Sequence, residues 1–136
     1  EARFYAHIND LLIAGAEAVL AETGDIAFQR VTVPGALEVP TVIAMAHAAG
    51  AFDGFVALGC VIRGETTHYE LVAGESCRGL VDLGTQQGIA IGNGILTVEN
   101  EAQALVRADP SQKDKGGDAA RAVLALLEIK RRVLGG

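Results

Sequence analysis

Cysteines, aromatic residues and long apolar runs are all scarce in this sequence of 136 residues. It has no tryptophan and only two cysteines, Cys60 and Cys77, which stand in apolar surroundings without a CxxC or Cys/His spacing. This usage excludes a disulfide framework and a thiolate metal site, and it favours a reduced, cytoplasmic protein. Half of the residues are hydrophobic, yet no apolar run approaches the roughly eighteen residues that cross a bilayer. We therefore expect no membrane-spanning segment.

Positive charge is also in short supply. The formal net charge is −6, because 11 lysines and arginines face 17 acidic residues. This balance argues against nucleic acids and anionic membranes as partners. A phosphate-bearing ligand would need a local cluster of basic groups. The length predicts one domain, residues 1–136, that is large enough to bury a core.

The spacing of apolar residues predicts alternating helices and strands. Helical periodicity covers residues 5–24, 37–49, 67–83, 99–108 and 118–134, while short apolar or alternating runs cover 29–33, 54–61 and 89–98. This alternation predicts an α/β fold with a parallel sheet and helices on both faces. Ligands of such sheets bind outside the carboxyl ends of the strands. Gly92 and Gly94 interrupt the last predicted strand, which indicates either a bulge or a close approach of other backbone.

The stretch 59–70 is where we expect the chemistry. An apolar strand ends there, the chain turns polar at Arg63, and either Thr66 or Thr67 can cap the helix that follows. The unpaired N–H groups and the positive dipole end of a first helical turn favour an anion. His68, in the same turn, is of the residue type whose ordinary pKa lies near neutrality. The stretch thus offers a proton carrier beside an anion site, although a lone histidine in a first turn is more often solvated or part of the cap.

The residues Arg-Gly-Glu-Thr-Thr-His-Tyr-Glu at 63–70 resemble the signature of the 6,7-dimethyl-8-ribityllumazine synthase family. The resemblance extends over nearly the whole chain, through Ala2-Arg3-Phe4, Val33-Pro34-Gly35-Ala36-Leu37-Glu38-Val39-Pro40, Gly94-Ile95-Leu96-Thr97-Val98-Glu99-Asn100 and Lys115-Gly116. Any one of these stretches is a modest match. Their occurrence in order, at compatible spacing, is highly specific.

The resemblance implies a flavodoxin-like fold, a three-layer α/β/α sandwich whose parallel sheet has the strand order 2-1-3-4. Family members usually begin with an apolar strand ahead of the residues that match Ala2-Arg3-Phe4, and this first strand is missing here. The implied enzyme is a transferase that condenses 5-amino-6-(D-ribitylamino)uracil with 3,4-dihydroxy-2-butanone 4-phosphate. The products are 6,7-dimethyl-8-ribityllumazine, phosphate and water, in the penultimate step of riboflavin biosynthesis.

The resemblance also implies the partners. They are the two small-molecule substrates, further copies of the chain in a homopentamer or a shell of pentamers, and riboflavin synthase, which receives the product. No metal and no redox cofactor is implied. The chemistry consists mostly of proton movement and of the positioning of two bound molecules.

Individual residues take roles by the same resemblance. His68 shuttles protons. The ribitylaminouracil is expected to contact Phe4, Gly35, Ala36, Leu37, Glu38, Cys60, Val61, Ile62 and Asn93. The phosphate is expected to contact Gly64, Glu65, Thr66, Arg107 and Lys115. In the family, the residues that match Asn93, Arg107 and Lys115 come from the neighbouring subunit, so each site is split across an interface.

Several of these residues have an ordinary alternative. Phe4 can equally pack in the core, and Glu38 can be a plain acidic residue of a first helical turn. Cys60 is disfavoured as a nucleophile, because a thiol in apolar surroundings at a strand end should have a raised pKa. Lys113 can share or replace the role of Lys115.

Two positions depart from the family pattern. Asn93 stands where many members have a phenylalanine over the ligand, and Asp114 stands where asparagine is common. His7 and His47 fit no part of the signature, so we expect them to be structural or to face solvent.

Three hypotheses of function follow. The first is the enzyme in a ring of five subunits. The second is a module that binds a flavin or lumazine without turnover, which the departure at Asn93 and the missing first strand suggest. The third is an assembly protein that builds shells. A flavodoxin-like domain without activity is the remaining alternative, and it leaves His68, Arg107 and Lys115 unexplained.

Overall fold

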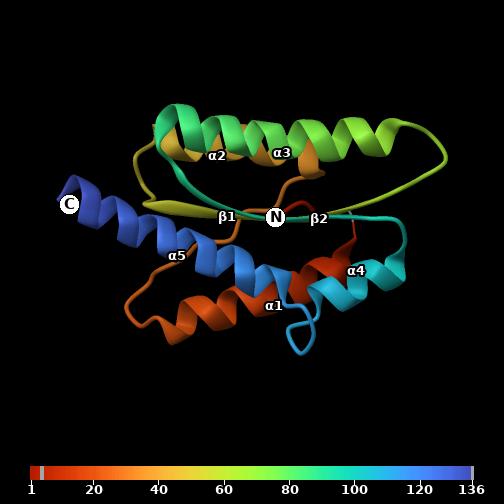
Figure 1. Cartoon of the computed structure of the whole chain (residues 1–136), viewed down its shortest axis with the longest axis horizontal. Helices are drawn as coiled ribbons and strands as arrows, with labels where there is room; N and C mark the ends of the chain where they lie inside the picture. The colour runs from red at the N-terminus through yellow and green to blue at the C-terminus, as the bar shows by residue number, and fades with distance from the viewer. Residues whose placement is uncertain (4, 136) are drawn as a thin grey trace.

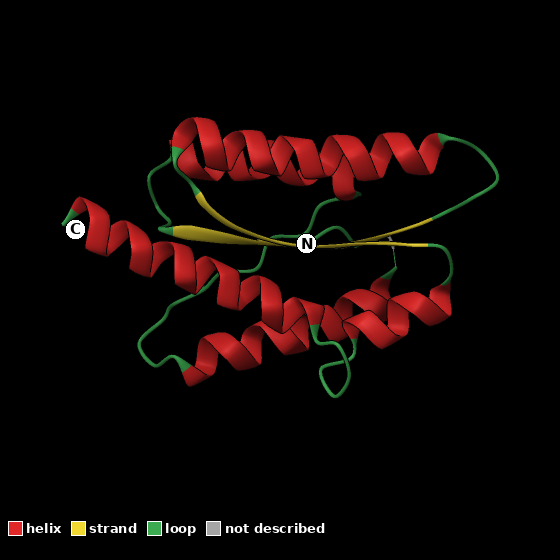
Figure 2. Cartoon of the chain, viewed as in Figure 1, coloured by secondary structure: helices red, strands yellow, loops and turns green. Residues whose placement is uncertain are grey.

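The computed structural model describes residues 1–3 and 5–135, which form three layers (Figure 1). The middle layer is a pair of parallel strands, β1 (Gly54–Ile62) and β2 (Ala90–Val98). One face carries η1 (Ala36–Glu38), α2 (Val39–Ala48) and α3 (His68–Gln87), and the other carries α1 (Ala6–Glu22), α4 (Glu101–Ala108) and α5 (Lys115–Leu134). Figure 2 shows that helices make up both outer layers. The predicted α/β sandwich is confirmed.

The two strands pair without interruption. Every residue from Gly54 to Ile62 has a partner in β2, so the glycines at 92 and 94 form no bulge. Gly92 instead lies against α5, where an added Cβ would come within 1.9 Å of the Ala119 carbonyl oxygen. Of the two predicted alternatives, the close approach is correct. Both faces of the sheet are covered, as is usual for parallel strands.

The strand predicted at 29–33 is wrong over most of its length. Residues 29–32 are irregular, and only Val33 forms a bridge, parallel to Ala2. Ala2 also donates its N–H to the Leu58 carbonyl oxygen at 2.8 Å, so it lies between Val33 and β1. A strand needs a continuous row of backbone partners, and among the described residues the amino terminus supplies such partners only at 31 and 33. Across the sheet the segments lie in the order Val33, Ala2, β1 and β2, which corresponds to the predicted strand order 2-1-3-4.

Buried side chains anchor the amino-terminal residues and fill both sides of the sheet. Asn9 of α1 is fully buried and donates its amide N–H to the Ala2 carbonyl oxygen. One apolar cluster, around Ile8 and Leu12, joins the sheet to α1, α4 and α5, and a second, around Ile43, joins it to α2 and α3. None of the described helices is both long and apolar enough to cross a membrane.

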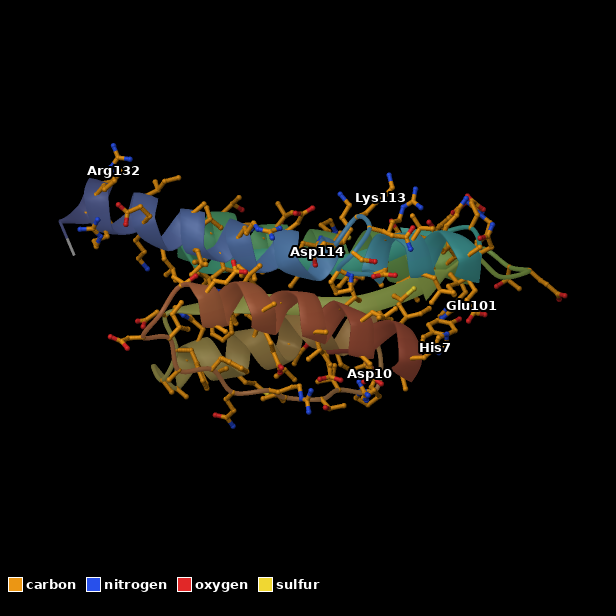
Figure 3. All side chains as sticks on the ribbon, turned by 90° about the horizontal axis from the view of Figure 1, so that it is seen from below. His7, Asp10, Glu101, Lys113, Asp114 and Arg132 are labelled. Carbon is orange, nitrogen blue, oxygen red and sulfur yellow. The ribbon has the colours of Figure 1, made fainter. Side chains whose placement is uncertain are left out.

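Two of the helix starts that differ from the prediction have a clear local cause. α5 starts at Lys115 rather than at 118, because Asp114 caps it: this residue has a left-handed backbone (φ 47°) and its carboxylate accepts the Gly117 N–H at 3.2 Å. Figure 3 shows Asp114 at the crossing of α1 and α5. The helix predicted from 37 begins as the 3-10 turn η1 and becomes α-helical only at Val39, with Pro40 in the first turn as predicted.

Candidate functional site

The carboxyl end of β1 gathers most of the predicted site residues that one chain can supply. β1 ends at Ile62, residues 63–67 form a loop outside the sheet, and α3 begins at His68 (Figure 1). The segment 34–38 follows Val33 to the same end of the sheet. Ala36 of that segment and Val61 of β1 belong to one buried cluster. The predicted site segments 34–38 and 60–68 therefore lie where we expected the site, at the carboxyl end of the sheet.

The loop between β1 and α3 presents backbone donors. The N–H groups of Glu65, Thr66 and Thr67 have no hydrogen-bond partner among the described residues. Thr67 holds the N-cap position without a side-chain bond, whereas the Thr66 hydroxyl accepts the His68 N–H at 3.3 Å. The two threonines thus share the capping role. Unpaired donors at the start of a helix of 20 residues form an arrangement that suits a phosphate group.

His68 stands directly after these donors. Its side chain is exposed and makes no hydrogen bond or ion pair with another described residue. Both ring nitrogens are thus available to a bound ligand. A positioned imidazole with free nitrogens can both accept and donate a proton, which is the requirement for a proton shuttle.

Arg63 is the residue of this site that the sequence reasoning missed. Its Nε lies 2.7 Å from Glu99 Oε2 and its Nη1 lies 3.8 Å from Glu70 Oε1, while the guanidinium carbon lies 4.7 Å from the centre of the Tyr69 ring. Arg63 therefore connects the ends of both strands to the first turn of α3 and holds the loop between them. No local pattern pairs it with Glu99, because only the pairing of β1 with β2 brings the two together.

The residues expected to contact the uracil differ in burial and in the face of the sheet to which their side chains point. Cys60 is buried and faces α1, α4 and α5, whereas Val61 is buried on the α2 and α3 side. Only main-chain groups of Cys60 can therefore reach a ligand on the α3 side. In the η1 turn, Ala36 is buried, and Leu37 and Glu38 are exposed. Gly35 precedes that turn in an extended conformation.

Asn93 lies in the middle of β2 rather than at its carboxyl end. It is exposed, it pairs with Ala57 of β1, and its amide is already engaged. The Nδ2 group contacts Cys77 Sγ at 3.4 Å, and Oδ1 accepts the Ile95 N–H at 2.9 Å. One chain therefore does not bring Asn93 to its own candidate site.

Arg107 and Lys115 lie in the layer on the other side of the sheet from His68 (Figure 1). Arg107 donates to the Gln103 carbonyl oxygen at 3.1 Å, and the Lys115 ammonium lies 3.7 Å from Asp118. Lys113, the alternative to Lys115, is exposed and extends outward in Figure 3. A single chain does not unite these cations with the loop at 63–67.

The remaining predicted positions add little. Phe4 lies outside the described residues. His7 is exposed and its Nε2 lies 2.6 Å from Glu101 Oε1, which places it in a surface pair (Figure 3). His47 lies in the last turn of α2, whereas the candidate site adjoins the first turn of that helix.

Comparison with known proteins decides the family. The sequence profile described as 6,7-dimethyl-8-ribityllumazine synthase matches residues 1–131. A protein of that name from Novosphingobium aromaticivorans is 64% identical over 132 residues, which are 97% of this chain and 94% of the relative. Those from Erythrobacter litoralis and Zymomonas mobilis are 65% and 59% identical, over 97% and 98% of this chain and 93% and 94% of theirs.

The chain belongs to the lumazine synthase family. The resemblance found in the short motifs thus extends along the chain, and the parallel α/β sandwich agrees with it.

Cys60 is the cysteine among the site residues predicted for this member of the lumazine synthase family, and its buried side chain faces away from the α3 side of the sheet. Burial raises the pKa of its thiol to about 11. This agrees with the sequence-based argument against a nucleophilic Cys60, because the thiolate is the reactive form.

We expect Cys60 to be alkylated slowly. In a Cys77→Ser background, iodoacetamide at pH 8 should modify folded Cys60 about 100-fold more slowly than the same thiol in denaturant, because the folded pKa is about 11 against an ordinary 9.0. The rate should rise with pH up to about 11. The measurement is mass spectrometry of the modified fraction against time.

The raised pKa of Cys60 also makes the free energy of unfolding depend on pH. Between about pH 9 and 11 the folded chain keeps a proton that the unfolded chain releases, so the free energy of unfolding should fall across this interval. A Cys60→Ala variant should lack this contribution. Rapid alkylation of folded Cys60 at pH 8 would contradict the burial argument.

Proposed function

We propose that the carboxyl end of β1 is the active site for the lumazine synthase reaction, with His68 as the proton carrier. The observation that supports this most directly is the adjacency of unpaired N–H groups at 65–67 and a free imidazole at 68, in a chain of this family. Cys60–Ile62 and Gly35–Glu38 reach the same end of the sheet and are our candidates for the walls of the ribitylaminouracil site.

The proposed roles follow from the chemistry of the two substrates. The phosphate of 3,4-dihydroxy-2-butanone 4-phosphate accepts hydrogen bonds from the loop at 64–66, through backbone groups, so that the Glu65 carboxylate points away. The amine of 5-amino-6-(D-ribitylamino)uracil attacks the ketone, and His68 moves the protons that this step, phosphate departure and ring closure require. Glu38 contacts the ribityl hydroxyls. Holding both substrates in one site supplies much of the remaining acceleration.

The phosphate needs cations that one chain does not supply. Within the described part of the chain, the basic group nearest in sequence to the loop is Arg63, which is already engaged by Glu70 and Glu99. Arg107 and Lys115 lie beyond the sheet. We therefore propose that a neighbouring copy contributes Arg107 and Lys115, and Asn93 at the uracil. An arginine fork is well suited to a phosphate.

The proposed assembly is a homopentamer rather than a shell, with each active site at the boundary of two subunits. Phe4 is proposed to stack on the pyrimidine ring. Residues 1–136 act as one domain of a cytoplasmic enzyme that uses no metal and no redox cofactor. Its product passes to riboflavin synthase.

Mixed subunits test the split site. His68→Ala and Arg107→Ala chains should each be nearly inactive alone, because every site lacks one group. When the two are unfolded together and reassembled in equal amounts, about a quarter of the interfaces should pair an intact His68 with an intact Arg107. Turnover with both substrates, followed by lumazine absorbance, should recover to about that fraction of the wild-type rate.

The control is reassembly of each single variant with the His68→Ala/Arg107→Ala chain, which cannot create an intact site. Recovery should be absent there. If the mixture of single variants stays as inactive as its components although sizing shows assembled oligomers, the split site is wrong. Wild-type turnover at the uncatalysed rate would instead refute the enzymatic function itself.

A further inference from the structure

A line of polar contacts joins the loop at 63–67 to α4. At the carboxyl end of the sheet, β1 leads into this loop and β2 leads into α4 (Figure 1). Arg63 is the first residue after β1, and it donates its N–H to the Val98 carbonyl oxygen at 2.9 Å. Its side chain contacts the residue after Val98, with Nε 2.7 Å from Glu99 Oε2. An ion pair thus extends the pairing of the two strands beyond the end of the sheet.

The same guanidinium spans the loop. Arg63 Nη1 lies 3.8 Å from Glu70 Oε1, and the guanidinium carbon lies 4.7 Å from the centre of the Tyr69 ring. Both partners belong to the first turn of α3. The unpaired N–H groups at 65–67 lie between Arg63 and these partners in the sequence. Arg63 therefore closes the loop that carries the proposed phosphate donors.

Glu99 connects Arg63 to the start of α4. It donates its N–H to Gln103 Oε1 at 2.8 Å, while Gln103 donates its own N–H to Asn100 Oδ1 at 2.9 Å. This reciprocal arrangement resembles a capping box, which fixes the direction in which a chain enters a helix. Glu99 thus has its side chain on Arg63 and its backbone on the first turn of α4.

Arg107 is bonded to the same turn. Although it lies near the end of α4, its Nη1 donates to the Gln103 carbonyl oxygen at 3.1 Å, so the guanidinium is folded back toward the start of the helix. Within the described residues it has no carboxylate partner, and its charge remains available to a ligand. One continuous line of contacts therefore runs from the loop of a subunit, through Glu99 and Gln103, to its Arg107.

We propose that Arg63 is a positioning residue for two active sites at once. Directly, it holds the loop and His68 of its own subunit. Through Glu99 and Gln103, it also holds the Arg107 that the subunit contributes to the adjoining site. This inference rests on the proposed function, in which each site takes Arg107 from a neighbouring copy. Arg63 does not itself bind the phosphate, because carboxylates of α3 and of the segment after β2 already balance its charge.

Reassembled mixtures of two variant chains separate the two effects. When Arg107→Ala and His68→Ala chains are mixed, every intact site takes His68 from the first chain and Arg107 from the second. Arg63→Ala is then added to the His68→Ala chain, whose own loop lies only at inactive sites. The KM for 3,4-dihydroxy-2-butanone 4-phosphate should rise about three- to tenfold, and the KM for the ribitylaminouracil should stay nearly unchanged. Steady-state turnover, followed by lumazine absorbance, measures both constants.

A rise in KM is a readout that a loss of folding or assembly does not reproduce. Fewer assembled sites would lower the maximal rate and leave the KM of the remaining sites unchanged. When Arg63→Ala is placed on the Arg107→Ala chain instead, the maximal rate should fall about tenfold as well, because the variant then displaces the loop that carries the working His68.

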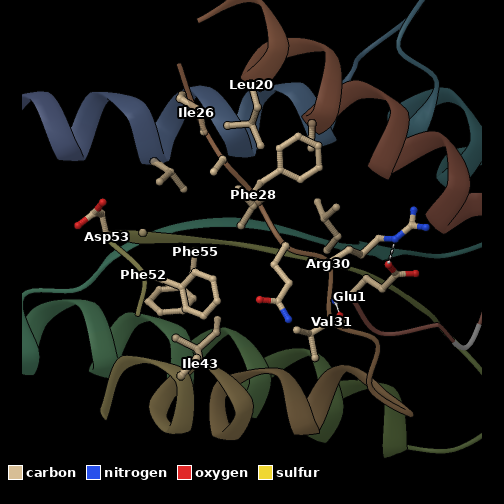
Figure 4. Close-up of a pocket in the computed structure, with 18 of the residues that line it drawn as sticks. Glu1, Leu20, Ile26, Phe28, Arg30, Val31, Ile43, Phe52, Asp53 and Phe55 are labelled. Carbon is tan, nitrogen blue, oxygen red and sulfur yellow. Dashed lines mark hydrogen bonds and ion pairs between the residues drawn. The ribbon is translucent and has the colours of Figure 1, made fainter. Parts of the chain in front are cut away.

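Two further variants of the His68-deficient chain test the route. Glu99→Ala should raise the KM as much as Arg63→Ala does, and the double variant should raise it no further, because residues that act through one contact are not additive. Arg30→Ala is the matched control. This exposed arginine pairs with Glu1 and Glu17 and lines a groove beside the amino-terminal half of β1, at the other end of the sheet (Figure 4). Its loss should leave both KM values unchanged.

Three results would overturn the inference. They are an unchanged KM when Arg63→Ala is on the His68→Ala chain, an equal rise in KM with Arg30→Ala, and a double variant whose effect is the product of the two single effects. Absence of turnover in the mixture that keeps Arg63 in both chains has a different meaning: it refutes the split site of the proposed function, and this inference with it.

Discussion

Replacement of His68 by alanine should lower the turnover rate by about 10²–10⁴, the range that a positioned proton carrier contributes. The imidazole is exposed, carries no bond to another described residue, and directly follows the donors at 65–67. Its loss should therefore affect chemistry more than folding. Steady-state turnover with both substrates, followed by lumazine absorbance, measures the effect.

Two controls separate proton transfer from a structural effect. Free imidazole at millimolar concentration should restore part of the His68→Ala rate, because a small base can enter the vacated space. His7→Ala removes another exposed imidazole, one paired with Glu101, and should keep nearly full activity. A His68→Ala chain as fast as the wild type would remove the proton-shuttle role.

The second large effect is on stability. Gly92→Ala should lower the free energy of unfolding by about 3 kcal/mol or more. The new Cβ would stand 1.9 Å from the Ala119 carbonyl oxygen, 2.8 Å from its carbonyl carbon and 2.9 Å from Val123. Two of these atoms are helix backbone, so α5 has to move away from the sheet. Since typical domains unfold at a cost of about 5–15 kcal/mol, the change is a large share of the total.

Gly74→Ala is the matched control. Gly74 is an exposed residue of α3, and a Cβ added to it meets nothing within 4 Å. Alanine in an exposed helix interior should stabilise by about 0.5–1 kcal/mol. Urea unfolding followed by circular dichroism compares both variants with the wild type. A Gly92→Ala midpoint near that of the wild type would contradict the close approach of α5.

Local patterns predicted the elements whose apolar faces are buried in the core. The apolar run at 54–61 and the periodic helices after it form as expected, because each buries one face or stripe against the sheet. The stretch 29–33 has a strand-like alternation too, yet it stays irregular except at Val33. A strand depends on backbone partners from elsewhere in the chain, and local alternation contains no information about them.

The same distinction applies to the candidate site. The loop, the threonine cap and His68 are close in sequence, so the sequence could place them together. The ion pair of Arg63 with Glu99 and the contact of Asn93 with Cys77 join residues from different elements, and only the packed fold reveals them. Arg107 and Lys115 lie on the other side of the sheet from His68 in one chain, so the roles that we propose for them depend on a neighbouring copy.

The irregular stretch at 29–32 has a consequence for handling the protein. Proteases bind their substrates in an extended form, and cleavage concentrates where backbone is exposed and weakly bonded. The Arg30 side chain is exposed, and among the described residues only its ion pairs to Glu1 and Glu17 hold it. Trypsin should find its first site here, and the nick would separate α1 from the rest of the polypeptide while the packing between them persists.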